Sequence, residues 1–320
     1  MTVTVLGAGS FGTALAISIG QQRDVILWAR DAEQVAQMRR DRLNRKRLPD
    51  AAVPAGVYPT DDLVAACAND IILLAVPMQS LAGFLADNAA ALDGKMLVAC
   101  CKGVDQNTGL GPVETIIAQV PSAQAALLTG PSFANDIAVG LPTALTLACT
   151  DENLGGQLQQ ALATPVLRLY RTTDTIGAEL GGAFKNVIAI ASGVAIGAGL
   201  GDSARAALMT RGFAEMTRLA QQRGARASTM AGLSGFGDLT LTCTSAQSRN
   251  YRLGLALGSG EVFDDRITVE GAATARALRD VAGTDNYDLP ITVTVAAILD
   301  KTMDVETAMA TLLARPLKEE

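Results

Sequence analysis

The chain has 320 residues, of which 49% are hydrophobic and 18% charged, so its length suits two domains with ample apolar side chains for their cores. The net charge of −6 argues against a general nucleic-acid or membrane-surface binder. Histidine is absent, which excludes Ser-His-Asp and Cys-His catalysis, His-ligated zinc and His–Asp proton relays. Lysine becomes the leading candidate for proton transfer, because burial can lower the pKa of an ammonium towards neutrality.

The first predicted element is a short β-branched strand, residues 2–6, which ends at a glycine turn and continues into a helix from Ser10. The turn has the spacing Gly7-x-Gly9-x-x-Gly12. The first glycine allows the tight turn, the second lets backbone approach a pyrophosphate, and the third lets the helix pack on the strand. The helix-start amides and the positive end of the helix dipole would then face the phosphates. The three glycines are therefore predicted to bind a dinucleotide.

Apolar strand-like runs alternate with helical stretches through the first half of the chain. The predicted strands are Val25–Trp28, Asp70–Val76, Lys95–Cys101 and Ala125–Thr129, with helices such as Ala32–Arg42 and Gln79–Leu92 between them. A further strand pair is expected at Thr143–Ala148 and Val166–Tyr170, with a helix at Asn153–Ala163 between. This rhythm predicts a doubly wound parallel sheet of Rossmann type, with ligands at the carboxyl ends of its strands.

After about Thr173 the pattern changes to long helical stretches punctuated by glycine. The predicted helices are Ile176–Ile196, Ala204–Arg223, Ser228–Leu233, Asn250–Leu257, Thr274–Val281, Thr292–Leu299 and Val305–Leu313. We therefore expect an α/β protein in which residues 1–173 form the Rossmann-type dinucleotide-binding domain. Residues 174–320 are expected to form an all-α substrate-binding and catalytic domain.

The cysteines and the apolar segments indicate a cytoplasmic protein. Cys67, Cys100, Cys101, Cys149 and Cys243 show no C-x-x-C spacing, and the adjacent pair is expected on opposite faces of a strand. Buried, reduced thiols are predicted, and neither a metal site nor a signal peptide is expected. The most apolar segment, residues 187–201, is shorter than the ~20 residues of a membrane span, so no stable membrane insertion is expected.

The end of the second predicted strand bears on the choice of cofactor. NAD enzymes typically place an acidic residue there on the ribose, but this chain has Arg30 followed by Asp31. Arg30 can bind a 2′-phosphate and so favours NADP. A surface arginine paired with Asp31, and Asp31 on the ribose, are the alternatives left open. The basic run that follows is interpreted as a solvated helix face and loop, with electrostatics near the adenosine as the alternative; it comprises Arg39, Arg40, Arg42, Arg45, Lys46 and Arg47.

Two further strand ends carry polar groups. Lys102 follows the run 97–101, and Gly130-Pro131-Ser132-Phe133-Ala134 follows the next predicted strand. Because the carboxyl ends of parallel strands meet at one edge of a sheet, these groups are expected to face the same crevice.

Lys185 lies in the otherwise apolar segment GGAFKNVIAI of the second half. A lysine there carries a large desolvation cost unless it is paired or used, and the alternative is that it extends to the surface. Lys185→Ala is expected to leave the fold intact, because removing a buried ammonium relieves that cost. The small residues 181–183 suggest close approach of another backbone or a ligand. Asp238 follows a glycine turn and is able to orient a lysine ammonium.

The segment Thr244–Asn250 has the Ser and Asn content of a helix N-cap, with Arg249 beside it. An arginine together with free helix-start amides makes a phosphate site. Glu270, in the sequence Val-Glu-Gly, adds a carboxylate that can reach a ribose or an amide.

Taken together, these motifs resemble the bacterial NAD(P)-dependent glycerol-3-phosphate dehydrogenases along nearly the whole chain. The matching segments are GAGSFGTALA, WAR, LPD, VP, KG, GPSFA, GLPTA, GGAFKNVIAIASG, TRGFAEM, GFGDLTLTCTSAQSRN and VEG. The pairing of GGAFKN with GDLTLTC and QSRN is far more specific than the glycine fingerprint, so the resemblance extends to the substrate site and not only to the fold.

The resemblance implies a reversible reduction of dihydroxyacetone phosphate to sn-glycerol 3-phosphate, which supplies glycerophospholipid synthesis. NADPH is the preferred cofactor and NADH the alternative; the partner is a small phosphorylated substrate, with no nucleic acid, and a homodimer is left open. The implied cofactor contacts, beside the glycine turn, are Ser10, Phe11, Arg30, Lys102, Ala134, Arg249 and Glu270. The implied substrate contacts are Lys102, Gly130, Ser132, Lys185, Asp238, Ser248, Arg249 and Asn250. Lys185 would be the general acid–base, oriented by Asp238, and Lys102 would add positive charge where the oxyanion forms.

The sequence departs from the family pattern at two points. Asp31 follows Arg30 where a second base is usual, and Asp105 stands where the family more often has Glu. Two other interpretations remain: a two-domain dehydrogenase of the hydroxyacid or ketopantoate type, and a non-catalytic NADP-sensing protein. The phosphate-site segment TCTSAQSRN argues against the first. The second would need the glycine turn and Arg30 but not Lys185.

Overall fold

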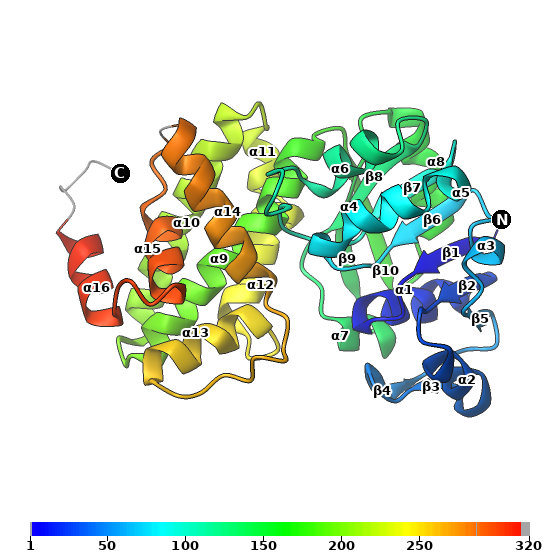
Figure 1. Cartoon of the computed structure of the whole chain (residues 1–320), viewed down its shortest axis with the longest axis horizontal. Coiled ribbons are helices and arrows are strands. Elements are labelled where there is room, and N and C mark those ends of the chain that lie inside the picture. The colour runs from blue at the N-terminus through cyan, green and yellow to red at the C-terminus, as the bar shows by residue number, and fades with distance from the viewer. Residues whose placement is uncertain (1, 286, 315–320) are drawn as a thin grey trace. The chain divides into compact units, whose positions relative to one another are not determined.

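The computed structural model describes residues 2–285 and 287–314, which fold into two compact units (Figure 1). Unit 1 comprises Met1–Lys102 and Leu110–Glu179, and unit 2 comprises Gly103–Gly109 and Leu180–Glu320. The chain therefore passes between the units three times. The domain boundary expected at 173/174 stays a prediction, and residues 286 and 315–320 of the expected second domain lie outside the described residues.

Unit 1 is built on an eight-stranded sheet in the order β10-β9-β8-β7-β6-β1-β2-β5. These strands are β1 (Val3–Leu6), β2 (Val25–Trp28), β5 (Val57–Thr60), β6 (Ile71–Leu74), β7 (Met96–Ala99), β8 (Gln124–Thr129), β9 (Thr143–Ala148) and β10 (Leu167–Thr172). All neighbouring pairs are parallel except β8 and β9. The predicted doubly wound, Rossmann-type sheet is confirmed, with this one antiparallel pair as a departure.

Helices cover both faces of the sheet, which explains why its central strands are apolar throughout. In β6, Ile71 and Leu73 join the core on one face, and Ile72 and Leu74 join the core on the other. The first face packs against α1 (Ser10–Gly20), α2 (Ala32–Asp41), α7 (Ala134–Ala138) and α8 (Glu152–Leu162). The second packs against α3 (Leu63–Ala66), α4 (Met78–Asp87), α5 (Ala89–Leu92) and α6 (Pro112–Gln119). The single helix predicted at 79–92 is divided into α4 and α5 at Asn88.

Three strands of unit 1 were not predicted. β5 is an edge strand that contains Pro59, and proline weakens a strand signal in the sequence. β3 (Leu43–Asn44) and β4 (Leu48–Ala52) form a separate antiparallel hairpin that begins within the basic run, which was interpreted as helix face and loop. This hairpin adjoins the glycine turn.

All five cysteines are buried and free, in agreement with the prediction. Cys100 and Cys101 belong to the cores on opposite faces of the sheet. Burial raises the pKa of the Cys100 thiol far above its usual range and that of Cys243 to about 12. Both groups therefore remain thiols near neutral pH.

The regular elements in the described part of unit 2 are all helices, as predicted. Its elements are the greater part of α9 (Thr175–Gly197), α10 (Gly201–Gln222), α11 (Ala227–Met230), the π-helical turn η1 (Leu233–Gly237), α12 (Asp238–Thr244), α13 (Arg249–Ser259), α14 (Glu270–Asp285), α15 (Pro290–Leu299) and α16 (Val305–Leu313). α9 is long and apolar enough to cross a membrane by length and composition, but 83% of its most apolar window is buried inside the structure. Phe184 and Val187 are both fully buried, so α9 is the core helix of unit 2.

Helices α9 and α13 meet backbone to backbone through glycines spaced four residues apart. These are Gly193 and Gly197 on α9, and Gly254 and Gly258 on α13. A Cβ added at Gly193 would lie 2.2 Å from the Tyr251 carbonyl oxygen, and one at Gly254 would lie 2.1 Å from that of Ile190. No larger residue fits this crossing without moving a helix. The contact fixes the start of α13 beside the middle of α9.

Candidate active site

The glycine turn after β1 has the close contacts that its spacing predicts. Gly7 has a φ of +118°, which only glycine adopts readily, and an added Cβ would lie 2.5 Å from the Ala75 carbonyl oxygen. A Cβ at Gly12 would lie 2.0 Å from the Gly7 carbonyl oxygen. At Gly9, by contrast, a Cβ would meet nothing within 4 Å. Gly7 and Gly12 are thus required by packing, while the space above Gly9 is open for a ligand.

The start of α1 is suited to a phosphate. Its N-cap, Gly9, provides no side-chain cap, and the first turn holds no acidic residue. The amides there are therefore not competed for by a capping oxygen, and the helix dipole favours an anion. The half-buried Phe11 packs against the core and anchors this turn. The residues present therefore fit the pyrophosphate of a dinucleotide.

Arg30 follows β2 and is exposed. Asp31 is the N-cap of α2, since its carboxylate accepts hydrogen bonds from the backbone N–H groups of Glu33 (3.0 Å) and Gln34 (3.2 Å). Its second oxygen lies 3.8 Å from the Lys46 ammonium. Within the residues that the structure describes, Arg30 forms no ion pair with Asp31. The guanidinium of Arg30 is therefore the group offered at this strand end.

Lys102 and Ser132 converge on the Gly130 carbonyl, although they follow different strands. The Lys102 ammonium and the Ser132 hydroxyl each donate to that oxygen over 3.1 Å. Gly130 has a φ of +136°, which turns the chain sharply after β8 and presents its carbonyl to both groups. Ala134 begins the short helix α7 that follows, and it packs against the core. The shared contact with the Gly130 carbonyl agrees with the expectation that the polar groups after β7 and β8 face the same place.

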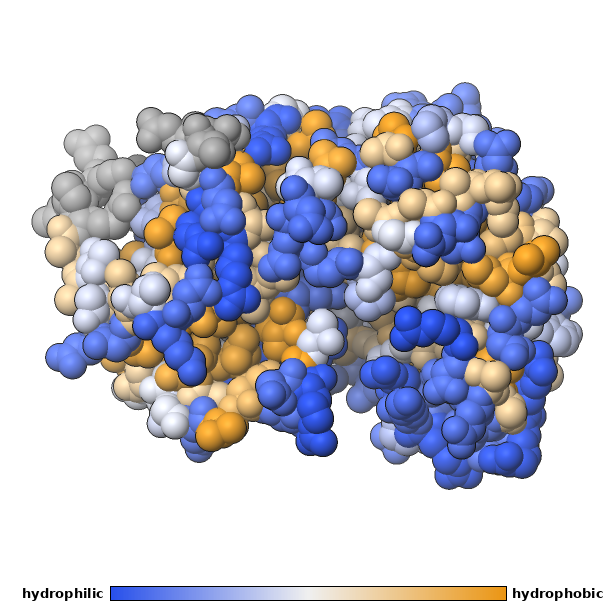
Figure 2. Space-filling model, viewed as in Figure 1, coloured by the Kyte–Doolittle hydropathy of each residue, from blue (hydrophilic) through white to orange (hydrophobic). Residues whose placement is uncertain are grey.

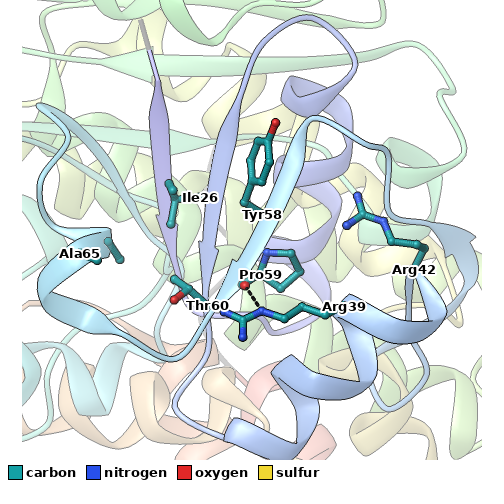
Figure 3. Close-up of a pocket in the computed structure, with 8 residues that line it drawn as sticks. Ile26, Arg39, Arg42, Tyr58, Pro59, Thr60 and Ala65 are labelled. Carbon is teal, nitrogen blue, oxygen red and sulfur yellow. Dashed lines mark hydrogen bonds between the residues drawn. The ribbon is translucent and has the colours of Figure 1, made fainter.

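A surface pocket of about 320 Å³ lies elsewhere on unit 1, beside β2 and β5 (Figure 3). Arg39 and Arg42 line it, together with Tyr58 and Pro59. Arg39 donates to the Pro59 carbonyl at 2.8 Å, and Arg42 donates to the carbonyl of Val57 at 3.1 Å. These two members of the basic run therefore brace the edge strand. No residue predicted for the site lines this pocket.

Unit 2 holds a buried ion pair. The Lys185 ammonium lies 2.6 Å from a carboxylate oxygen of Asp238 and 2.9 Å from the Thr242 hydroxyl oxygen. Lys185 is 6% exposed and Asp238 is 1% exposed. Asp238 begins α12 directly after the π-helical turn, so the glycine-rich segment places its carboxylate against α9. The close approach expected at Gly181 is also present, because an added Cβ would lie 2.5 Å from the Ser234 carbonyl oxygen.

This pair changes the expectation for a Lys185 variant. The ammonium is compensated by Asp238, so its removal would leave a buried carboxylate without its cation, which is strongly destabilising. The sequence interpretation did not include Thr242. That residue lies one helical turn after Asp238, and its hydroxyl donates to the Asp238 backbone carbonyl over 2.6 Å. The spacing of four residues between Asp238 and Thr242 was the available signal.

The start of α13 presents a cation and helix-start amides together. Ser248 is its N-cap, and the Ser248 hydroxyl oxygen accepts from the Tyr251 backbone N–H at 3.2 Å. Arg249 is the first helical residue and is exposed, and the first turn holds no acidic residue. The predicted cap and arginine are both present, in an arrangement that favours a bound phosphate.

Two asparagines join α9, α13 and α14. The Asn250 side-chain amide donates to the Asn186 side-chain oxygen at 2.9 Å, and the Asn250 oxygen accepts from the Gly271 backbone N–H at 2.9 Å. A Cβ at Gly271 would lie 2.6 Å from that oxygen, so glycine is required there. Glu270 is half-buried at the first position of α14. Asn186 was not predicted, although it directly follows Lys185.

Comparison with known proteins matches both parts of the chain to one family. Residues 2–155 match the family described as the NAD-dependent glycerol-3-phosphate dehydrogenase N-terminus, and residues 174–310 match its C-terminus. A glycerol-3-phosphate dehydrogenase (NAD(P)+) of Ruegeria sp. (strain TM1040) is 60% identical over 320 residues, with 100% of both chains covered. The chain belongs to this family.

Other members of the glycerol-3-phosphate dehydrogenase family extend the similarity. The enzyme of the same name from Roseobacter denitrificans is 59% identical, again with 100% of both chains covered. The crystal structure of glycerol-3-phosphate dehydrogenase from Coxiella burnetii superimposes with a TM-score of 0.92 at 34% identity, covering 98% of this chain and 99% of that one. The family resemblance identified from the motifs is confirmed.

Proposed function

We propose that this chain is an oxidoreductase that catalyses the reversible NAD(P)H-dependent reduction of dihydroxyacetone phosphate to sn-glycerol 3-phosphate. One observation carries the proposal: the buried Lys185 ammonium is held by Asp238 and Thr242 in the unit that also presents Arg249 at the start of α13. This pairing provides a proton donor and an anion site for one small phosphorylated substrate. The names of the family relatives support the same reaction.

Lys185 is proposed as the general acid–base of the reaction. A nicotinamide, when bound, supplies the hydride to the substrate carbonyl carbon. Lys185 then gives a proton to the developing alkoxide, and it takes the proton back in the reverse direction. Asp238 holds the ammonium in place at 2.6 Å, and Thr242 limits its movement from a second side. Lys102 is proposed to add positive charge where the oxyanion forms.

The phosphate of the substrate is proposed to bind at the start of α13. Arg249 offers a planar guanidinium and the helix offers its first amides. Asn250 is held in one orientation by Asn186 and Gly271, which suits a residue that must position a ligand. Gly130, Ser132 and Ser248 complete the proposed substrate contacts. Binding energy from the phosphate would then orient the carbonyl for reaction.

NADPH is proposed as the preferred cofactor, with NADH as the alternative. The pyrophosphate would lie in the open space above Gly9, held by the backbone amides of Ser10 and Phe11. The Asp31 carboxylate is engaged as the N-cap of α2. Arg30 would therefore be the residue that binds the 2′-phosphate. The other proposed cofactor contacts are Lys102, Ala134, Arg249 and Glu270. We propose that the enzyme is cytoplasmic and that its product supplies glycerophospholipid synthesis.

The loss of NADPH absorbance on addition of dihydroxyacetone phosphate tests the reaction, with NADH run in parallel. We expect rapid oxidation of NADPH, and we expect Arg30→Ala to lower kcat/KM with NADPH while changing kcat/KM with NADH little. Dihydroxyacetone and ketopantoate serve as unphosphorylated controls. Turnover of these controls in preference to the phosphorylated substrate would refute the substrate assignment. NADPH binding without oxidation on any carbonyl substrate would favour a sensing protein.

A further inference from the structure

The turn between β3 and β4, residues 45–47, is held against the glycine turn of unit 1. Asn44 is fully buried, and its side-chain amide donates to the Ala8 carbonyl at 3.1 Å and to the Thr13 hydroxyl at 2.8 Å. Gln34 donates to the same Ala8 carbonyl at 2.9 Å and to the Asn44 side-chain oxygen at 3.1 Å. This network fixes the hairpin next to the first turn of α1.

Ser10 links the same turn to the start of α1. Its hydroxyl donates to the Arg47 backbone carbonyl over 2.7 Å. Ser10 is the first residue of α1, whose helix-start amides have no side-chain cap. The backbone of Arg47 is therefore anchored at the end of the helix where a pyrophosphate would bind. The surface over α2, β3 and β4 is largely hydrophilic (Figure 2).

The other cations of the basic run already have partners. These are the Pro59 carbonyl for Arg39, Asp41 for Arg40 and Arg45, the carbonyls of Val53 and Val57 for Arg42, and Asp31 for Lys46. Arg47 differs from them. Among the residues of the chain that the structure describes, none accepts a hydrogen bond from the exposed Arg47 guanidinium. Its charge is therefore the one in this run that is left for a ligand.

We propose that Arg47 binds the pyrophosphate of the dinucleotide cofactor, alongside the first amides of α1. The proposal rests on the proposed function, which places NAD(P)H on the glycine turn. A guanidinium presents paired N–H groups that match two phosphate oxygens, and its charge is independent of pH in the working range. NADH and NADPH share the pyrophosphate. Arg47 therefore strengthens the binding of both, whereas Arg30 acts on the 2′-phosphate that only NADPH carries.

Trp28 provides an internal reporter for the test, because it is the only tryptophan of the chain and is the last residue of β2. Its fluorescence is followed while NADPH and, separately, NADH are titrated into the full-length wild type and its Arg47→Ala variant. We expect the dissociation constant of each cofactor to rise about tenfold in the variant, as for loss of one charge-assisted hydrogen bond. Alanine retains the backbone carbonyl that accepts from Ser10, so the hairpin stays anchored.

Three variants distinguish a specific effect of Arg47 on cofactor affinity from an effect of the overall surface charge. Arg45→Ala removes an exposed arginine of the same turn that is paired with Asp41, and its effect should be less than twofold. Arg47→Lys keeps the charge but not the paired N–H groups, and it should recover part of the affinity. Arg30→Ala should weaken the binding of NADPH but not the binding of NADH. Equal effects of Arg45→Ala and Arg47→Ala would overturn the proposal.

Ser10→Ala tests whether the hydrogen bond from Ser10 to the Arg47 backbone contributes to cofactor binding. If Ser10 acts on the cofactor through the Arg47 backbone, the effects of Ser10→Ala and Arg47→Ala will be less than additive in the double variant. Fully additive effects of the two substitutions would refute this coupling.

An Arg47→Ala effect on NADPH binding alone would refute the pyrophosphate assignment, and no effect on the binding of either cofactor would refute the proposal entirely. Failure of the wild type to bind NADPH or NADH would instead refute the proposed function.

Discussion

Glu179 and Val113 are joined by a 2.6 Å hydrogen bond in which the Val113 backbone N–H, in the first turn of α6, donates to the Glu179 carboxyl group. The carboxyl group lies against Gly111, where an added Cβ would come within 2.6 Å of its oxygen. Burial raises the pKa of Glu179 to about 8, the hydrogen bond from Val113 opposes this rise, and the charge of Glu114 adds to it.

Glu179 is therefore expected to make stability depend on pH. The folded chain holds the Glu179 proton up to about pH 8, whereas the unfolded chain loses it near the ordinary value of 4.5. The free energy of unfolding should fall as pH rises between these values, by about 1.4 kcal/mol per pH unit. Glu179→Gln has no such proton to lose, so its urea-unfolding free energy should decline less over this window. Glu114→Gln is the control and should retain most of the decline. Parallel pH profiles for the wild type and Glu179→Gln would contradict the assignment.

Lys185→Met is expected to lower kcat by about 10²–10⁴-fold, the range typical of general acid–base catalysis. It should also destabilise the protein by about 3–5 kcal/mol, because Asp238 is left buried without its cation. The double variant Lys185→Met/Asp238→Asn should recover much of that stability without recovering turnover. Thermal unfolding and steady-state kinetics of the same samples separate the two effects. Turnover near the wild-type rate in either variant would exclude Lys185 as the acid–base group.

Arg249→Ala is expected to raise KM for dihydroxyacetone phosphate by at least tenfold, since a charge-assisted hydrogen bond contributes about 1.5–3 kcal/mol. The KM for unphosphorylated dihydroxyacetone should be unchanged, because that substrate lacks the group that Arg249 binds. Arg252→Ala, at another exposed arginine of α13, is the matched control. An equal effect of Arg249→Ala on both substrates would argue against a phosphate contact.

Gly193→Ala is expected to destabilise unit 2 by about 1–3 kcal/mol or more, because the new methyl group would overlap the Tyr251 carbonyl oxygen at 2.2 Å. Gly283→Ala is the control in the same unit. Gly283 is exposed in α14, and an added Cβ would meet nothing within 4 Å. Its replacement should be neutral or stabilising by up to about 1 kcal/mol. Chemical denaturation of both variants measures the difference, and similar losses would show that the helix crossing tolerates a methyl group.

Much of the fold follows from local patterns in the sequence. The glycine turn and the alternation of strands with helices predicted the Rossmann-type sheet, because both depend on residues close together in the chain. The hairpin of β3 and β4 was missed for the opposite reason. β3 has two residues, and Asn44 is held there by Ala8 and Thr13, which lie far away in sequence. Edge strand β5 was missed because Pro59 masks its strand pattern.

The candidate site shows a similar division. A lysine inside an apolar helix requires an anionic partner, and Asp238 on a glycine turn was the evident candidate, so their contact could be predicted. Thr242 and Asn186 are ordinary polar residues whose importance depends on what packs against them. Their partners, Lys185 and Asn250, are brought close only by the folding of α9, α12 and α13.

The segment Gly103–Gly109 has a consequence for the order in which this chain is made. Val104 packs with Ala183 and Ala277 in unit 2, yet it leaves the ribosome before the second part of unit 1, Leu110–Glu179, is made. Val104 therefore cannot pack against Ala183 and Ala277 until the later helices that carry them are synthesised. A fragment ending at Glu179 would contain every strand of the sheet but would lack both packing partners of Val104. No single cut in the gene therefore separates the two units cleanly.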